Sequence, residues 1–284
     1  MAKIAVIGAS GMLGYDLMNA GRPDDTLVGL AHADIEITDP ASVAVALERC
    51  RPEVVINAVA IIKTELCETE PDRAFLVNAV GAYNVAKAAA GLGAAVVFIS
   101  TDYVFDGSKP SFTEEDAPYP LNVYGASKLA GEILTKIANP KHFIIRTGWL
   151  FGKKVSHKGY NFVTLMLERA KSEAEVRVVN DQTGSPTYTL DLALKIYELI
   201  RHQAPFGIYH ITNQGGATWY EFAKKIFELS GVSPQLIPIT TAESGTKIAR
   251  PAFSVLENQG LPEFGISPLR PWQEALRAYL DEIM

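Results

Sequence analysis

The stretch that decides the fold is residues 3–14, which read Lys-Ile-Ala-Val-Ile-Gly-Ala-Ser-Gly-Met-Leu-Gly. The apolar run Ile4–Ile7 is typical of a buried strand, and a helical spacing of apolar residues begins at Met12. Between them, Gly8 and Gly11 permit a tight turn and allow a pyrophosphate group to approach backbone N–H groups at a helix N-terminus. This G-x-x-G-x-x-G spacing between a strand and a helix predicts a nucleotide site, and the alternative is a tight turn that binds nothing.

Working outward, short apolar runs alternate with amphipathic ones across the first half of the chain. Strands are predicted at Lys3–Ile7, Thr26–Leu30, Glu53–Ala58, Ala94–Ile99 and His142–Thr147. Helices are predicted at Met12–Ala20, Pro40–Cys50, Asp72–Gly91 and Asn122–Ala138. Apolar strands that are regularly separated by helices are typical of parallel strands joined by βαβ crossovers. We therefore predict the α/β class with a doubly wound, Rossmann-like parallel sheet.

The pattern changes after Thr147, where turn residues become more frequent. Helices are predicted there at Phe162–Lys171, Leu190–His202, Trp219–Leu229 and Trp272–Ile283, and short strands at Val176–Asn180, Ile208–Thr212 and Leu236–Ile239. We expect residues 1–147 to form a dinucleotide-binding domain. Residues 148–284 are expected to form mainly a smaller, mixed α/β substrate lobe, with some segments returning to the first domain and a cleft at the strand ends.

The composition excludes several classes of protein. Of 284 residues, 26 are Lys or Arg and 32 are Asp or Glu, so the net charge of −6 argues against a general nucleic-acid surface. No apolar run reaches the roughly 18 residues that a membrane helix needs, and no signal peptide is recognisable. We therefore expect a cytoplasmic protein with no membrane or nucleic-acid partner. The two cysteines, Cys50 and Cys67, lack the spacing of zinc ligands, so no metal site is predicted.

The segment after the second predicted strand bears on the choice of nicotinamide coenzyme. An acidic residue there favours NAD, and basic residues favour the 2′-phosphate of NADP. Residues 30–39 contain acids but no Lys or Arg, and the candidate cations are His32 and, in a nearby loop, Arg22. This composition favours NAD, or the use of both coenzymes. Asp39 is interpreted as the N-cap of the helix that starts at Pro40 rather than as a ribose ligand.

Tyr124 and Lys128 lie one helical turn apart on the helix predicted at Asn122–Ala138. Their side chains share one face, and a neighbouring ammonium lowers the pKa of a phenol, which makes tyrosine a usable acid or base. Ser100 and Thr101 follow the fourth predicted strand, where parallel sheets bind ligands, so Thr101 is placed to hydrogen-bond a substrate carbonyl. The alternatives are chance spacing in the helix and a hydroxyl turn at the strand end.

Together these motifs resemble the extended short-chain dehydrogenase/reductases. The residues that carry this resemblance are Gly8, Gly11, Gly14, Asn57, Ala58, Asn78, the run Ser100-Thr101-Asp102-Tyr103-Val104-Phe105-Asp106-Gly107, Tyr124, Gly125, Ser127, Lys128, Gly131 and Glu132. A narrower set is similar to the dTDP-4-dehydrorhamnose reductases, namely Arg146–Leu150, Asn161, Phe162, Asp181–Thr187, Gly207–His210, Arg250 and Pro251. The resemblance covers nearly the whole chain.

The resemblance implies hydride transfer from NADPH or NADH to the C4 ketone of a 6-deoxy-4-keto nucleotide-diphosphate sugar, with dTDP-4-dehydro-L-rhamnose as the leading candidate. It implies that Tyr124 gives a proton, that Lys128 lowers the pKa of Tyr124 and holds the nicotinamide ribose, and that Thr101 polarises the carbonyl. The implied cofactor contacts are Gly8, Ser10, Gly11, Met12, Leu13, Gly14, Glu36, Ile37, Ala58, Ala60, Tyr124 and Lys128. The implied substrate contacts are Asp102, Tyr103, Trp149, Asp181, Gln182, Thr187 and Arg250. For Arg250 the alternatives are a diphosphate clamp and a surface ion pair, and for Trp149 a substrate wall and a core aromatic.

Three positions depart from the reductase pattern: Ile62 where Thr is usual, Lys63 after it, and Phe253 where Asn is usual. An apolar side chain cannot make the hydrogen bonds of the polar one it replaces, so these positions bear on the choice of sugar. Two other functions stay open. One is a reductase or 4-epimerase acting on another sugar, and the other is a dinucleotide-binding regulatory subunit resembling that of methionine adenosyltransferase. A homodimer is also left open.

Overall fold

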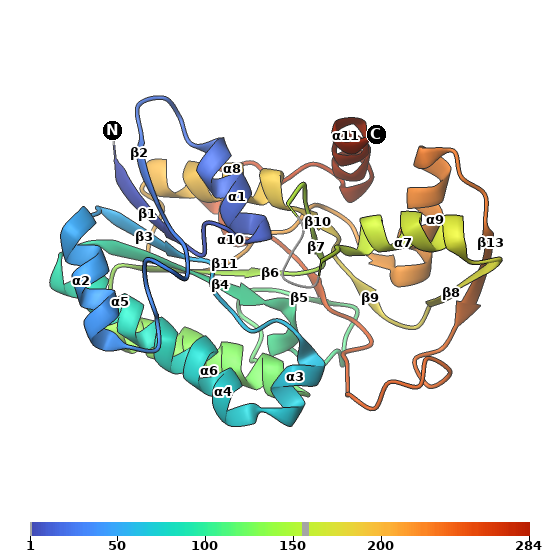
Figure 1. Ribbon diagram of the computed structural model, residues 1–284, viewed down its shortest axis with the longest axis horizontal. Helices are drawn as coiled ribbons and strands as arrows, with labels where there is room; N and C mark the ends of the chain where they lie inside the picture. Colours follow the sequence, from blue (N-terminus) through green and yellow to red (C-terminus); the bar gives the residue numbers. More distant parts are fainter. Residues whose placement is uncertain (1, 155–158) are drawn as a thin grey trace.

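The computed structural model describes residues 2–154 and 159–284. Its centre is a six-stranded sheet with the order β11-β6-β4-β3-β1-β2, in which every pairing is parallel (Figure 1). The strands are β1 (Lys3–Ile7), β2 (Thr26–Leu30), β3 (Val54–Asn57), β4 (Ala95–Thr101), β6 (His142–Thr147) and β11 (Gly207–His210). The predicted doubly wound parallel sheet is confirmed, and β1, β2 and β6 have the predicted bounds.

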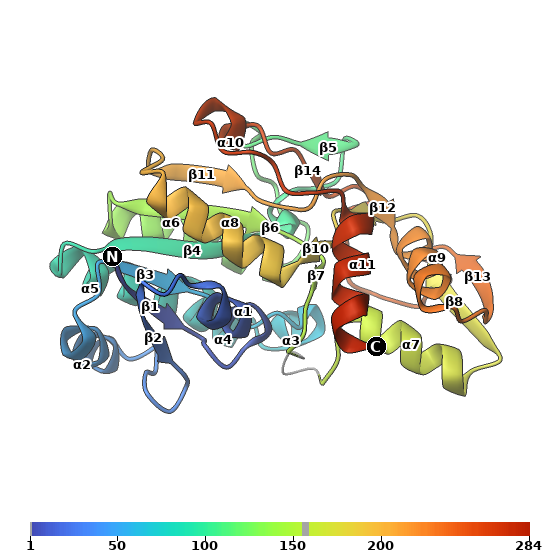
Figure 2. The ribbon, with the colours of Figure 1, turned by 90° about the horizontal axis from the view of Figure 1, so that it is seen from above.

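Helices cover both faces of this sheet (Figures 1 and 2). On one face lie α1 (Met12–Ala20) and α8 (Thr189–Arg201), and on the other lie α2 (Pro40–Cys50), α5 (Ala82–Gly91) and α6 (Val123–Ala138). Successive side chains of β1 alternate between the two faces, so that Ile4 and Val6 join the cluster of α1 and α8 whereas Ala5 and Ile7 join that of α2 and α5. Burial on both sides explains why these strands are apolar without polar alternation.

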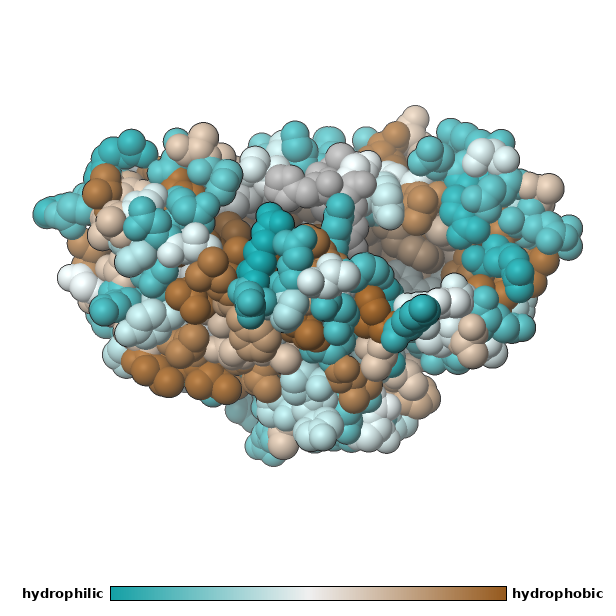
Figure 3. Space-filling model, turned by 60° about the horizontal axis from the view of Figure 1, so that its bottom comes forward, coloured by the Kyte–Doolittle hydropathy of each residue, from teal (hydrophilic) through white to brown (hydrophobic). Residues whose placement is uncertain are grey.

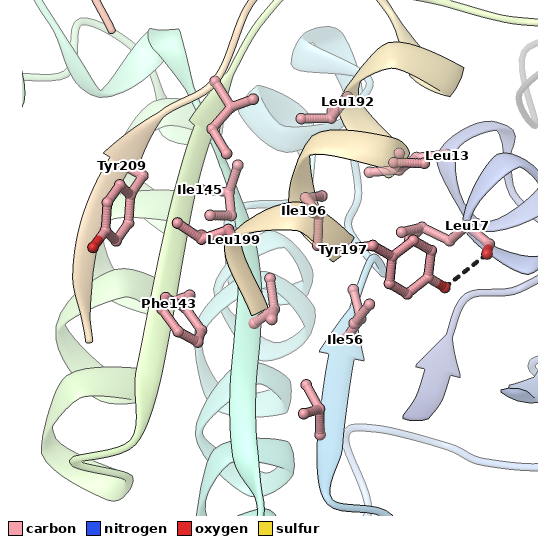
Figure 4. Packing of buried hydrophobic residues seen from close by; sticks show 14 of the residues in the cluster. Leu13, Leu17, Ile56, Phe143, Ile145, Leu192, Ile196, Tyr197, Leu199 and Tyr209 are labelled. Carbon is pink, nitrogen blue, oxygen red and sulfur yellow. Dashed lines mark hydrogen bonds between the residues drawn. The ribbon is translucent and has the colours of Figure 1, made fainter. Parts of the chain in front are cut away.

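Parts of the second half of the chain return to the main sheet. α8 packs on α1, where the Tyr197 hydroxyl donates a hydrogen bond to the backbone oxygen of Leu17 over 2.7 Å (Figure 4). β11 extends the sheet by pairing with β6. The second half therefore supplies both a strand and a helix to the main sheet, and the division into domains at residue 147 stays a prediction.

A smaller lobe lies beside the carboxyl ends of the main strands (Figure 2). It contains the parallel pair β8 (Glu175–Val179) and β13 (Gln235–Ile239) and the helices α7 (Phe162–Ser172), α9 (Trp219–Ser230) and α11 (Trp272–Ile283). Its apolar core is separate from the clusters on the main sheet and includes Phe151, Phe222, Trp272 and Tyr279. This is the smaller mixed α/β lobe that the sequence predicted.

Short elements complete the fold. They are α3 (Thr64–Thr69), α4 (Pro71–Phe75), the π-helical turn η1 (Leu76–Gly81), the 3₁₀ turn η2 (Asp102–Val104), β5 (Ser111–Phe112), β7 (Leu150–Phe151), β9 (Thr183–Gly184), β10 (Thr187–Tyr188), β12 (Ala217–Thr218), β14 (Val255–Leu256) and α10 (Gly260–Glu263). The helix predicted over residues 72–91 is therefore α4, η1 and α5 in succession, and a π turn of this kind frequently accompanies a functional site. Within the described residues, no helix is long and apolar enough to cross a membrane.

The glycine turn after β1 has the close packing that its sequence predicts. Gly8 has a φ of +84°, a backbone conformation that favours glycine. A Cβ atom on Gly14 would lie 2.0 Å from the backbone oxygen of Gly8, so only glycine allows α1 to sit this close to the turn. Gly11 caps α1 and supplies no side-chain acceptor, which leaves the N–H groups of the first helical turn uncapped by that residue.

We expect Gly14→Ala to destabilise the protein by about 1–3 kcal/mol, because the added methyl forces α1 away from the turn. It should also weaken dinucleotide binding, since the same displacement moves the N–H groups of the helix. Urea denaturation and a coenzyme titration measure the two effects. Gly91→Ala is the matched control, because a Cβ atom there meets nothing within 4 Å. A Gly14→Ala protein as stable as the control would contradict the close packing.

Candidate active site

A cleft of about 1170 Å³ runs along the carboxyl ends of the main strands. One wall is formed by the residues that follow β1 to β4 and β6, and the other by α7, β8 and the segment around residues 244–250. The space-filling view shows the surface hollowed between the two lobes (Figure 3). A ligand at the ends of parallel strands is typical of doubly wound sheets.

Nine of the ten predicted cofactor contacts outside α6 line this cleft. They are Gly8, Ser10, Gly11, Met12, Leu13, Glu36, Ile37, Ala58 and Ala60. Gly14 does not line it and instead allows α1 to approach the turn. Bare glycine backbone, an uncapped helix N-terminus and an adjoining apolar groove are the features that a dinucleotide requires. The residues present therefore fit a nicotinamide coenzyme.

The segment after β2 carries an exposed histidine, His32. The His32 ring lies 3.7 Å from the Glu36 carboxylate, and its side chain is 88% exposed. Hydrogen bonds from the backbone and hydroxyl of Thr38 lower the pKa of Glu36. Asp39 accepts a hydrogen bond from the backbone N–H of Ala41 and caps α2, in agreement with its interpretation as an N-cap.

Thr101, Tyr124 and Lys128 come together on the wall of the cleft. Thr101 ends β4, while Tyr124 and Lys128 lie on the first turns of α6. The Asn122 side chain caps α6 by accepting from the backbone N–H of Gly125 over 2.9 Å. A Cβ atom on Gly125 would lie 2.1 Å from the backbone oxygen of Tyr103, so glycine lets α6 pack directly on the turn after β4.

Burial sets the protonation of the two helical residues. It raises the pKa of Tyr124, and it lowers the pKa of Lys128 to about 7, which the Glu132 carboxylate opposes. The Lys128 ammonium lies 4.0 Å from the centre of the Phe98 ring and has no hydrogen-bond partner among the described residues. Burial thus raises the Tyr124 pKa in the free protein, where a lowering by Lys128 was expected, and the phenol stays protonated at neutral pH.

A buried ion pair behind Lys128 was not singled out from the sequence. Glu132 accepts two hydrogen bonds from Arg146, over 2.9 and 2.8 Å, and one from the Ser100 hydroxyl over 2.5 Å. All three side chains are almost completely buried, and they join α6 to β4 and β6. The sequence signal that could have indicated a role for Glu132 was its position one helical turn after Lys128.

The Asn78 side chain fixes the loop after β3. Its amide oxygen accepts from the backbone N–H of Ile61, and its amide nitrogen donates to the Ile61 oxygen and the Ser127 hydroxyl. The π turn η1 therefore ties the loop that carries Ala58 and Ala60 to the helix that carries Tyr124.

Five of the seven predicted substrate contacts line the cleft: Asp102, Tyr103, Trp149, Gln182 and Arg250. The other two do not. The Asp181 carboxylate accepts from the backbone and hydroxyl of Thr241, and Thr187 is buried, with its hydroxyl donating to the Ser185 backbone oxygen. Both support the loop that presents Gln182.

Arg250 reaches across from the C-terminal region to α3. Its guanidinium donates to the Glu65 carboxylate over 3.0 Å and lies 3.4 Å from the Thr64 hydroxyl. Of the two alternatives for Arg250, the structure has the ion pair, and Arg250 lies at the cleft wall. Its Nε is buried and has no hydrogen-bond partner among the described residues.

Aromatic rings and one face of α7 form a wall of the cleft, and the sequence predicted Trp149 in such a wall as one of two alternatives but did not predict the face of α7. Trp149 stacks on Trp219 with ring centres 3.4 Å apart and an interplanar angle of 3°. Phe162, Leu165, Met166 and Arg169 of α7 also line the cleft. Their spacing of three, four and seven residues places them on one helical face, and that spacing was the signal available for α7. Trp219, the first residue of α9, lines the cleft as well.

The similarity to known proteins extends over nearly the whole of this chain. The family model described as RmlD substrate binding domain matches residues 2–284. The chain is 43% identical over 284 residues to the spore coat polysaccharide biosynthesis protein SpsK of Bacillus subtilis (strain 168), covering 99% of this chain and 98% of that protein. It is 37% identical over 287 residues to a dTDP-4-dehydrorhamnose reductase of Sinorhizobium fredii (strain NBRC 101917 / NGR234), covering 97% and 95%. A crystal structure of dTDP-4-dehydrorhamnose reductase from Bacillus anthracis (strain Ames) in complex with NADP matches with a TM-score of 0.95 and 39% identity over 99% of both chains.

Proposed function

The chain belongs to the RmlD substrate binding domain family, that of the dTDP-4-dehydrorhamnose reductases, and from this premise we propose that it reduces the C4 ketone of a nucleotide-linked 6-deoxy-4-keto sugar. The substrate proposed first is dTDP-4-dehydro-L-rhamnose, which would give dTDP-L-rhamnose. The observation that carries the proposal is that Thr101, Tyr124 and Lys128 lie on one cleft with the glycine turn after β1.

The coenzyme of this reaction is NADPH or NADH, which supplies the hydride when bound. We propose that Gly8, Ser10 and Gly11 hold its pyrophosphate with backbone N–H groups. Glu36 and Ile37 would adjoin the adenosine, and Ala58 and Ala60 would allow close approach of the nicotinamide half. NADP in the Bacillus anthracis reductase supports the assignment of the same coenzyme class here.

The protein itself supplies a proton and a dipole to the ketone. Tyr124, whose pKa burial raises, stays protonated and donates its hydroxyl proton to the oxygen on C4 as negative charge develops there. Lys128 holds the nicotinamide ribose beside Tyr124. Thr101 donates a hydrogen bond to the same carbonyl oxygen, and its place at the end of β4 fixes the direction of that bond.

On the substrate side, Tyr103, Trp149, Gln182 and Arg250 are proposed as direct contacts with the nucleotide sugar. A guanidinium suits the oxygens of a diphosphate, but Arg250 must then exchange its bond to Glu65 for the ligand. Asp181 and Thr187 act by holding the loop of Gln182. A homodimer remains a prediction that sedimentation equilibrium tests.

Turnover with a defined substrate tests the proposal. The protein is mixed with a dTDP-linked 4-keto-6-deoxy sugar and NADPH or NADH, and the loss of reduced coenzyme is followed by absorbance. We expect oxidation of coenzyme in equal amount to the reduced sugar formed. No oxidation, from protein that still binds coenzyme, would contradict the substrate. Epimerised sugar without net oxidation would indicate a 4-epimerase, and co-purification with a larger enzyme without turnover would indicate a regulatory subunit.

We expect His32→Ala to weaken NADPH binding by less than about tenfold and to leave NADH binding unchanged. The reason is that an exposed charge pair contributes only a fraction of the energy of a buried one. Isothermal titration with each coenzyme measures this difference. Equal losses for both coenzymes would show that His32 does not face the 2′-phosphate.

A further inference from the structure

The Thr101 hydroxyl has one proton to donate in a hydrogen bond, and more than one group competes as its acceptor. Its oxygen donates to Oδ1 of Asp102 over 3.0 Å and accepts from the backbone N–H of Tyr103 over 3.2 Å. It also lowers the pKa of the Tyr124 phenol, against the larger effect of burial. As long as the proton is directed to Asp102, Thr101 has none left to direct at a substrate carbonyl.

Asp102 is held from a distant part of the chain. The Ser254 hydroxyl donates to its other oxygen, Oδ2, over 2.6 Å, and Asp102 is only 3% exposed. Ser254 is fixed in turn, because its backbone N–H donates to the Thr183 oxygen. Both carboxylate oxygens of Asp102 are therefore occupied by protein hydroxyls.

Among the described residues, hydrogen bonds rather than an opposite charge act on the Asp102 carboxylate. The titratable side chains that face it are the phenols of Tyr103, on its own turn, and Tyr124, on α6, and its charge raises the pKa of each. The charge of Arg250, from the same segment as Ser254, acts on Tyr103 and lowers the pKa of its phenol, against the larger effect of burial. From the link after β6, Gly148 packs against the carboxylate and brings no charge.

We propose that Asp102 is a positioning residue rather than a substrate contact, and that its protonation, set by Ser254, decides whether Thr101 donates to Asp102 or to the substrate carbonyl. The proposal rests on the proposed reduction for its kinetic consequences. An ionised Asp102 retains the Thr101 proton. A protonated Asp102 is a weaker acceptor, so the hydroxyl of Thr101 is released to the carbonyl.

The direction of the pH dependence follows from the burial of this carboxyl. Burial raises the pKa of Asp102 to about 6, against the hydrogen bonds from Ser254 and Thr101. The rate of the reduction step should therefore rise as the pH falls through this value. The Ser254 hydrogen bond favours the ionised form of Asp102. Its loss should raise the Asp102 pKa, so the rise in rate should occur at higher pH.

Single-turnover reduction between about pH 5 and 9 tests the proposal in wild type, Ser254→Ala and Asp102→Asn. In wild type the rate should rise about tenfold towards low pH, the size of effect that one charge-assisted hydrogen bond gives. In Ser254→Ala the midpoint of the rise should move up by about one pH unit. Asp102→Asn, which has no titrating carboxyl, should lose the rise altogether.

Two further variants separate this mechanism from simple structural damage. Ser185→Ala is the matched control, because the Ser185 hydroxyl also bonds the segment after Ser254, accepting from the Leu256 N–H over 3.3 Å, without touching Asp102. Its profile should match wild type. Lys128 also titrates near neutral pH, but none of these changes touches it. In a Thr101→Val background, Ser254→Ala should no longer move the profile.

An unmoved midpoint in Ser254→Ala, or a shift that survives in Thr101→Val, would overturn the proposal even if Asp102→Asn does not fold. A raised KM for Asp102→Asn with an unchanged profile would instead make Asp102 a substrate contact. The carboxyl C=O band in infrared difference spectra between wild type and Asp102→Asn follows the protonation of Asp102 without any substrate. A band that titrates as expected in a protein without turnover would reject the proposed function and leave the placement of Asp102 intact.

Discussion

Replacement of Tyr124 by Phe should lower kcat at least about a hundredfold, because it removes the proposed general acid and leaves the ring in place. Tyr124 is half-buried at the cleft wall, its ring packs edge-on against Tyr103 at 5.8 Å between centres, and Phe preserves that contact. The affinity for coenzyme should change little. Steady-state turnover and a coenzyme titration on the same preparation separate the two quantities.

Tyr119→Phe serves as the control for this experiment, because Tyr119 is 70% exposed and does not line the cleft. Its turnover should equal that of wild type. If Tyr124→Phe retained turnover within a few-fold of the control, another group would have to supply the proton, and the role of Tyr124 would be rejected.

Glu132→Gln should destabilise the protein by about 3–5 kcal/mol, the second large effect that we expect. Arg146 is 2% exposed and directs two nitrogens at the Glu132 carboxylate, so a neutral amide leaves a buried guanidinium without its counter-charge. Ser100 loses its carboxylate acceptor at the same time. Denaturant unfolding monitored by circular dichroism measures the change in the free energy of unfolding.

The double variant Glu132→Gln with Arg146→Met tests the origin of this loss. Removal of both charges should recover much of the stability, because the larger part of the loss comes from the unpaired charge. Lys225→Ala, which breaks the exposed pair with Glu228, should change stability by less than about 1 kcal/mol. A Glu132→Gln variant as stable as Lys225→Ala would contradict the importance of the buried pair.

Local sequence signals predicted the fold, and they also selected Thr101, Tyr124 and Lys128, which line one cleft. The glycine turn and the apolar runs give β1, α1, β2 and α2 with their observed bounds, because each element depends on residues near it in sequence. The spacing of Tyr124 and Lys128 on α6 is likewise local. Short elements such as β5 and β14, which form a two-stranded sheet with each other, have too few residues to produce a pattern.

Contacts between distant segments could not be predicted in the same way. Ser254 bonds Asp102, and Arg250 bonds Glu65, across most of the length of the chain. No spacing in one sequence encodes such pairs. The pKa of Tyr124 belongs to the same class, because the burial that raises it comes from the packing of α6 on the turn after β4.

A deuterium label follows the proposed hydride most directly. NADPH deuterated at the transferred position is incubated with the protein and a dTDP-linked 4-keto-6-deoxy sugar, and the sugar is analysed by NMR and mass spectrometry. We predict that deuterium appears at C4 of the reduced sugar in equal amount to the coenzyme oxidised. Reduced sugar without the label, or oxidised coenzyme without a labelled sugar, would contradict direct reduction of the C4 ketone by this protein.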